Sequence, residues 1–127
     1  MDSERSTKIN IGGVEYELIL TTRATKEIAR RYGGLENLGE KLMKAENFEM
    51  ALDEIVWLIT LLSNQSVLID NRLKGEKRKP LTEEDVELLT SPLELATYKD
   101  AIMEAMFKGT KRNIESEEID PKNEQVE

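Results

Sequence analysis

Alternating apolar and polar residues near the start of the chain predict a β-hairpin. The alternation runs over residues 8–20 and is interrupted by Gly12-Gly13. Two glycines between alternating segments are typical of a two-residue turn, because glycine adopts positive φ readily. With this turn Ile11 pairs with Val14, and a one-residue slip would take the apolar side chains off their common face. The side chains expected on that face are Ile9, Ile11, Val14, Tyr16 and Leu18.

Beyond Leu20 the apolar residues recur every three to four positions, which is the spacing of helices. Thr21 or Thr22 can cap a first helix, and Gly33-Gly34 is expected to end it. A short second helix is expected over residues 35–43. The inward side chains expected on these two helices are Ala24, Ile28, Tyr32, Leu35, Leu38 and Leu42.

The longest predicted helix runs from Phe48 to about Leu73 and contains neither proline nor glycine. It is apolar on nearly all sides, which is typical of a central helix that other elements pack against. Its polar segment Asn64-Gln65-Ser66 allows a kink or a break. The stripe expected to face the core is Leu52, Ile55, Val56, Ile59 and Leu62. The residues expected to extend the apolar surface outward, as a partner-binding site, are Trp57, Leu58 and Leu61.

Two capping patterns predict the last helices. Thr82 and Ser91 each precede an acidic residue by three positions. The helix that begins after Ser91 is expected to end near Gly109. A basic loop, 72–79, comes before them. The residues expected to pack inward from the last helix are Leu95, Tyr98, Ile102, Ala105 and Met106.

The predicted fold is mainly α with a small N-terminal β-hairpin (α+β), with four to five helices around a central apolar helix. Residues 8–112 are expected to form one domain, after a frayed segment at 1–7. Residues 113–127 hold six acids and one base, so we expect a disordered acidic tail there.

Composition argues against most catalytic and metal chemistry. The 127 residues include no Cys and no His, which excludes thiol nucleophiles, imidazole bases and the usual zinc ligands. The acids at Asp53-Glu54, 83–85 and Glu94 fit helix caps and solvated faces better than a site. We therefore expect no catalytic residue, no bound metal, no cofactor and no enzymatic activity.

Charge and hydropathy constrain the partners and the location. The net charge of −8 opposes nucleic-acid binding, and the basic loop 72–79 is the only local feature in its favour. No uninterrupted apolar run reaches the ~18 residues of a membrane span, and residues 1–5 do not resemble a secretory signal. The sequence therefore predicts a soluble, cytoplasmic protein that binds neither nucleic acid nor membrane.

The order of these elements resembles the tail assembly chaperones of long-tailed phages and prophages. The resemblance covers about residues 8–110 and consists of helix and turn patterns without a chemical signature. The segments that carry it are the hairpin Ile9–Leu20 with its Gly12-Gly13 turn, the helix Thr21–Gly34, the middle helix Leu52–Leu62, and Pro80–Leu95 with the helix that follows to Phe107.

The resemblance implies a function in virion morphogenesis. Members of that family are not enzymes; they bind the helical tape-measure protein, help to recruit tail-tube subunits, and are absent from the mature virion. The exposed apolar surface also allows self-association. The alternatives left open are a small structural virion protein, such as a connector or tail completion protein, a metal-dependent enzyme that uses carboxylates, and a nucleic-acid-binding regulator.

Overall fold

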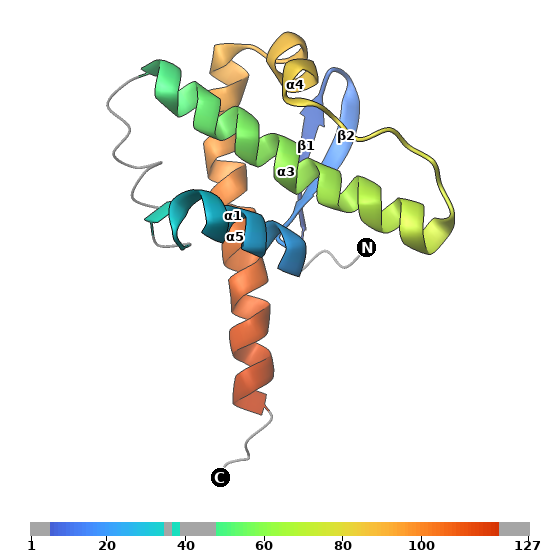
Figure 1. Ribbon diagram of the computed structural model, residues 1–127, viewed down its shortest axis with the longest axis vertical. Coiled ribbons are helices and arrows are strands. Elements are labelled where there is room, and N and C mark those ends of the chain that lie inside the picture. Colours follow the sequence, from blue (N-terminus) through green and yellow to red (C-terminus); the bar gives the residue numbers. More distant parts are fainter. Residues whose placement is uncertain (1–5, 35–36, 39–47, 120–127) are drawn as a thin grey trace.

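The computed structural model describes residues 6–34, 37–38 and 48–119 of the chain. Within these residues the protein is mainly helical with one two-stranded antiparallel sheet, as the sequence predicts (Figure 1). The elements are β1 (Ser6–Ile11), β2 (Val14–Ile19), α1 (Thr22–Tyr32), α3 (Phe48–Lys74), α4 (Glu83–Leu89) and α5 (Pro92–Ile119).

The hairpin has the predicted register. Ile11 pairs with Val14 and Ile9 with Tyr16, and both turn glycines have positive φ, 61° and 86°. Val14 lies on the expected apolar face but at its tip, where it remains 48% exposed. The expected frayed segment 1–7 was placed too far along the chain. β1 already begins at Ser6, and residues 1–5 lie outside the described residues.

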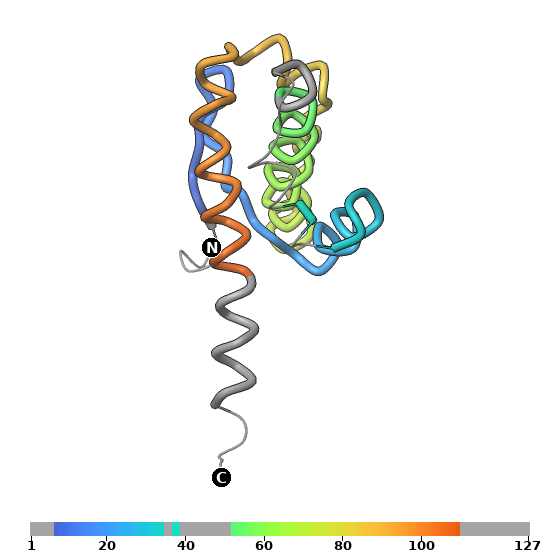
Figure 2. The backbone as a smooth tube through the Cα atoms, turned by 90° about the vertical axis from the view of Figure 1, so that its left-hand side faces the viewer, coloured from blue at the N-terminus to red at the C-terminus, as the bar shows by residue number. Residues whose placement is uncertain are grey.

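α3 is the central element of the fold. Figure 2 shows the hairpin and α5 on one side of α3 and α1 on the other. The Tyr98 hydroxyl of α5 donates a hydrogen bond to the Asn10 carbonyl oxygen of β1 at 2.5 Å, which joins α5 to the hairpin. Large side chains that are less than 2% exposed fill the space between these layers, and they are Ile11, Leu18, Ile19, Ile28, Leu38, Leu58, Ile59, Leu62, Val67, Val86 and Ile102.

The helix caps follow the sequence closely. Thr21 caps α1, and Gly33 ends it with a φ of 88°. Thr82 and Asp85 form the capping box of α4, and the Ser91 hydroxyl and Glu94 carboxylate make the same reciprocal pair at α5. The second helix expected over 35–43 lies mostly outside the described residues, although Leu38 is buried as expected.

The polar segment of α3 does not break the helix. α3 is continuous from Phe48 to Lys74. Gln65 and Ser66 donate hydrogen bonds to the carbonyl oxygens of Leu61 and Ser63 within the helix, while two asparagines bond to backbone beyond its end. Asn64 donates to the Leu81 carbonyl oxygen at 2.8 Å and accepts from the Leu81 N–H at 2.7 Å. Asn71 makes the same pair of bonds with Arg78, both at 3.0 Å. Two asparagines seven residues apart thus hold the basic loop, and Leu81 just after it, against α3.

Two expectations about the C-terminal part were wrong. Gly109 does not end α5; a Cβ at this position would lie 2.9 Å from the Leu20 Cβ. Glycine is used there because α5 passes close to Leu20. The helix then continues to Ile119, so the expected disorder over 113–127 does not hold for 113–119, while 120–127 lie outside the described residues.

Candidate partner-binding surface

The outward face of α3 is the most conspicuous candidate site. Trp57 and Leu61 are partly buried and lie on this face, as predicted. Leu58 was assigned wrongly, because it is fully buried in the core and cannot contact a partner without unfolding. The error arose because a helix that is apolar on nearly all sides does not itself indicate which side its neighbours cover.

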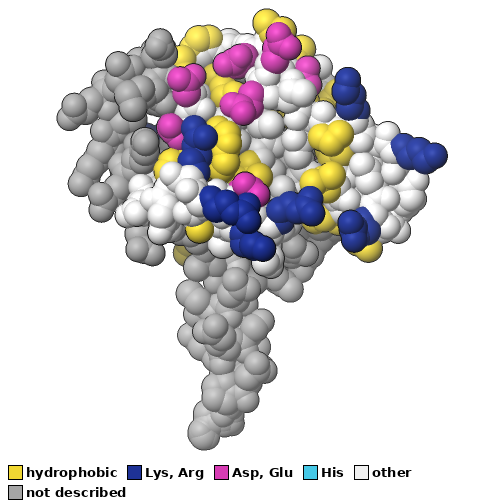
Figure 3. Space-filling view, viewed as in Figure 1, with side chains coloured by type: hydrophobic (Ala, Val, Ile, Leu, Met, Phe, Trp, Pro, Cys, Tyr) yellow, Lys and Arg dark blue, Asp and Glu magenta, His cyan; other side chains and the backbone are white. Residues whose placement is uncertain are grey.

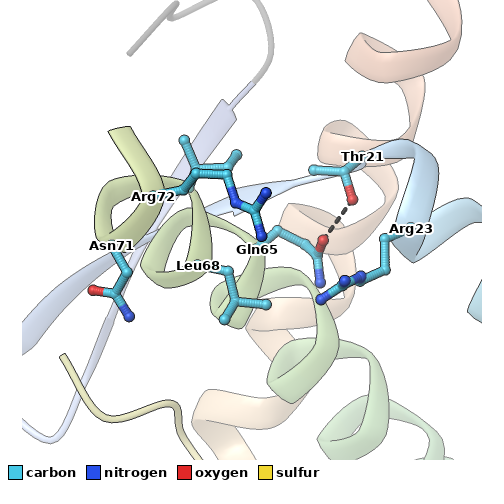
Figure 4. A pocket seen from close by; sticks show the side chains of 7 residues that line it. Thr21, Arg23, Gln65, Leu68, Asn71 and Arg72 are labelled. Carbon is cyan, nitrogen blue, oxygen red and sulfur yellow. Dashed lines mark hydrogen bonds between the residues drawn. The ribbon is translucent and has the colours of Figure 1, made fainter. Parts of the chain in front are cut away.

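A groove follows this face of α3. It consists of two adjoining hollows of about 320 and 530 Å³, which share the side chains of Arg23, Gln65 and Leu68. Figure 4 shows the second hollow, where Arg23 and Arg72 lie on either side of Leu68 and Gln65. The residues lining the two hollows are Thr21, Arg23, Glu27, Trp57, Thr60, Leu61, Asn64, Gln65, Leu68, Ile69, Asn71, Arg72 and Glu83. We call this surface the α3 groove.

The sequence analysis missed half of the α3 groove. Leu68 and Arg72 continue the face of Trp57 and Leu61 at helical spacing, and this spacing was the available signal. They were passed over because the polar segment Asn64-Gln65-Ser66, which separates Leu61 from Leu68, suggested a break in the helix.

α1 forms one wall of the groove and runs antiparallel to α3. At its start, the Thr21 hydroxyl accepts a bond from the Ala24 N–H at 3.0 Å and donates one to Gln65 Oε1 at 2.5 Å. At its end, Tyr32 and Arg31 both reach Glu54 of α3. Polar contacts at both ends therefore fix the position of α1 along α3.

The contacts around Glu54 have clear electrostatic consequences. The Tyr32 hydroxyl donates a hydrogen bond to Glu54 Oε1, and Arg31 Nε donates to the same oxygen at 3.2 Å. Burial, followed by the bond to Glu54, raises the pKa of Tyr32 well above its usual value. Burial lowers the pKa of Arg31, but hydrogen bonds to Glu54 and Tyr32 outweigh it and raise that pKa. The buried carboxylate is thus satisfied by two donors from α1.

Trp57 connects this ionic cluster to the groove. The Arg31 guanidinium carbon lies 4.5 Å from the Trp57 ring centroid, and the Tyr32 ring meets the Trp57 ring edge-on at 6.0 Å. A cation over an indole face is attracted by the ring quadrupole. These contacts hold the Trp57 indole in place at the end of the α3 groove that it lines together with Leu61.

The two sides of the α3 groove differ in charge, because α1 is mainly basic, with Glu27 as its one acid, and α4 is acidic. Figure 3 shows basic side chains along α1 and acidic side chains over α4, with apolar side chains between them. The exposed bases of α1 are Arg23, Lys26, Arg30 and Arg31, and the exposed acids of α4 are Glu83, Glu84 and Glu87. A ligand that suits this surface would be apolar along its centre and carry opposite charges on its two sides.

The acidic side chains and the apolar length of α3 bear on metal and membrane binding. In the described part of the chain, no three acidic side chains are placed to share a metal ion. Leu52–Lys74 of α3 is long and apolar enough to cross a membrane, contrary to the expectation drawn from uninterrupted runs. That expectation considered only uninterrupted apolar runs, whereas this stretch is apolar on average and contains polar residues at intervals. More than half of the stretch is buried in the fold, and the core helix of a globular protein can be equally long and apolar.

Comparison with known proteins identifies no relative. No family model, no curated protein and no solved structure matches this chain.

Proposed function

We propose that this protein is a tail assembly chaperone of a long-tailed phage or prophage, and that it holds a helical segment of the tape-measure protein in the α3 groove. The observation that carries the proposal is the partly exposed apolar row along α3, namely Trp57, Leu61 and Leu68. Side chains at this spacing suit the apolar face of another helix. In this function the protein has no enzymatic activity and acts in the cytoplasm of the host cell during virion morphogenesis.

The dimensions of the groove agree with a helical ligand. Its lining residues on α3 extend from Trp57 to Arg72, which corresponds to about 22 Å of helix, or roughly four turns. An amphipathic helix of that length presents an apolar stripe with charged residues on both flanks. Acidic residues on one flank would meet Arg23, and basic residues on the other would meet Glu83.

The test is co-expression with the tape-measure protein of the same phage or prophage. Wild type should keep the tape-measure protein soluble and co-purify with it. Leu61→Glu and Leu68→Lys each place a charge in the α3 groove, the second between Arg23 and Arg72, where an ammonium has no opposite charge beside it. Both should abolish both effects, because a buried unpaired charge is strongly unfavourable. Circular dichroism and the urea unfolding midpoint establish whether each variant is folded.

Leu88→Glu is the matched control, since it makes the same substitution as Leu61→Glu at a leucine that is 76% exposed on α4, away from the groove. It should keep the tape-measure protein soluble and co-purify with it, as wild type does. If wild type does not solubilise the tape-measure protein, the proposed function fails. If the control loses binding while the two groove variants keep it, the tape-measure protein binds at α4 and not in the α3 groove.

A further inference from the structure

The second hollow of the α3 groove is lined by two arginines and, among the described residues, by no acid. Arg23 enters it from α1 and Arg72 from α3, and Figure 4 shows both side chains reaching towards Gln65 from opposite sides. The hollow has a volume of about 530 Å³, and its apolar lining is Leu68 and Ile69. Two cations thus lie beside apolar side chains, with no anion lining the same hollow.

The acids nearest to these arginines in sequence are paired with other bases. Glu27, one turn along α1 from Arg23, lies 2.7 Å from Arg30. Asp70, two residues before Arg72, lies 3.5 Å from each of two bases that follow it in the chain. Within the described part of the chain, neither arginine of the hollow has an ion-pair partner.

The other polar side chains of the hollow are already used within the fold. The Thr21 hydroxyl donates a hydrogen bond to Gln65, which in turn donates to the Leu61 carbonyl oxygen at 3.0 Å. Asn71 is hydrogen-bonded to the backbone of Arg78. The two arginines are therefore the groups best placed to bind a ligand. Like charges that share a hollow repel each other, and an anion between them removes that cost.

We propose that the second hollow binds a carboxylate carried on a short apolar stem, as in a glutamate side chain. A guanidinium presents a planar fork of N–H donors that matches the two oxygens of a carboxylate. The methylene groups of the stem pack on Leu68 and Ile69. A nucleic-acid backbone fits less well, because it repeats its charge along the strand and the whole chain has a net charge of −8.

The source of the carboxylate is an acidic residue of the helix held in the α3 groove, and this point rests on the proposed function. The first hollow is lined by Glu27 and Glu83 beside Trp57 and Leu61, so an acidic residue bound there would meet like charges. The second hollow offers it two guanidinium groups instead. Charge therefore places the acidic residue of the bound helix at the Arg72 end and fixes the register of that helix along the groove.

A small carboxylate tests the hollow without any protein partner. Glutarate carries its carboxylates on a short methylene chain, and its binding is followed by NMR at the side-chain N–H signals. Saturable shifts are expected at Arg23, Arg72 and Gln65. Arg23→Gln/Arg72→Gln should weaken glutarate binding by about tenfold or more, because it removes charge-assisted hydrogen bonds. Absence of binding by wild type, or equal binding by the double variant, would overturn the proposal.

Lys8→Gln/Lys77→Gln is the matched control. It removes the same two positive charges at exposed positions that do not line the hollow. It should bind glutarate as wild type does. If it loses as much binding as the arginine variant, glutarate responds to the net charge alone and the proposal fails. Circular dichroism and the urea unfolding midpoint should be the same for both variants and wild type, since all four side chains are exposed.

The tape-measure protein tests the source of the carboxylate. Arg23→Gln/Arg72→Gln should bind it about tenfold or more weakly than wild type at low salt. The variant should also lose less affinity than wild type when salt is added, because fewer charge contacts remain to be screened. Once the bound segment is mapped, its acids are replaced by glutamine one at a time. One replacement should weaken binding by wild type and leave binding by the arginine variant unchanged.

The outcomes separate this inference from the proposed function. If wild type binds glutarate through the two arginines but does not bind the tape-measure protein, the proposed function fails and the hollow is a site for a free small carboxylate. If the arginine variant binds the tape-measure protein as tightly as wild type does, the proposed function stands. The acidic residue of the bound helix then does not lie in the second hollow, and the inference about its register is wrong.

Discussion

The Tyr32 hydroxyl, at the last turn of α1, donates a hydrogen bond to the buried carboxylate of Glu54 on α3. With Thr21 bonded to Gln65 at the other end of α1, this contact fixes the wall of the α3 groove. α1 has a short apolar face, with only Ala24 and Ile28 buried on it. The polar contacts at its two ends therefore matter more for its position than they would in a longer helix.

Removing the Tyr32 hydroxyl should weaken the fold measurably. Tyr32→Phe keeps the ring against Trp57 but removes a donor to a charged acceptor, which is expected to lower the free energy of unfolding by about 1.5–3 kcal/mol. Glu54→Ala should cost more than Tyr32→Phe, because it also removes the partner of Arg31. Urea unfolding measures both. Equal stability of wild type and Tyr32→Phe would mean that the hydroxyl is satisfied equally well by water.

The same contact predicts a loss of stability in alkaline solution. The pKa of Tyr32 is raised in the folded protein, first by burial and then by Glu54, and burial also raises the pKa of Tyr98. The unfolded chain releases these protons at about pH 10, while the folded chain retains them. The stabilisation is therefore complete below pH ~10 and is lost as the pH rises towards the folded pKa. Urea titrations above pH 10 should show a shallower decline for Tyr32→Phe than for wild type.

Gly109 should resist a substitution that normally strengthens a helix. Replacing glycine by alanine within a helix usually stabilises it by roughly 0.5–1 kcal/mol. Here the added Cβ would lie 2.9 Å from Leu20 Cβ, so we expect Gly109→Ala to destabilise the protein by about 1–3 kcal/mol. Its cost should be smaller when Leu20 is also replaced by alanine, which removes the other two close atoms. A more stable Gly109→Ala protein would show that α5 can shift away from Leu20 without loss.

Truncation to alanine should destabilise the protein strongly at Leu58 and hardly at all at Leu88. Leu58→Ala creates a cavity in the core and should lower the free energy of unfolding by about 2–5 kcal/mol. Leu88→Ala should change it by no more than about 0.5 kcal/mol, because that side chain is 76% exposed. Chemical unfolding of the two variants side by side gives the comparison. A small effect at Leu58 would restore it as a candidate for the partner-binding surface.

Local signals in the sequence determined most of the secondary structure. The Gly12-Gly13 turn set the register of the hairpin, and Thr82 and Ser91 marked the starts of α4 and α5. Each of these depends on the conformations and hydrogen bonds of a few neighbouring residues, so a short stretch of sequence is enough to predict it. The apolar spacing of Leu95, Tyr98 and Ile102 likewise identified the buried side of α5.

Tertiary structure decided which apolar side of α3 is covered, where α5 ends and what the polar residues of α3 do. Leu58 is buried and Trp57 lies at the groove because the hairpin, α1 and α5 occupy particular sides of α3, and their placement depends on packing between distant segments. Asn64 is hydrogen-bonded to Leu81, seventeen residues away. Gly109 leaves room for the side chain of Leu20, eighty-nine residues away. The local sequence cannot reveal such roles, because the interacting partner is supplied only when the chain folds.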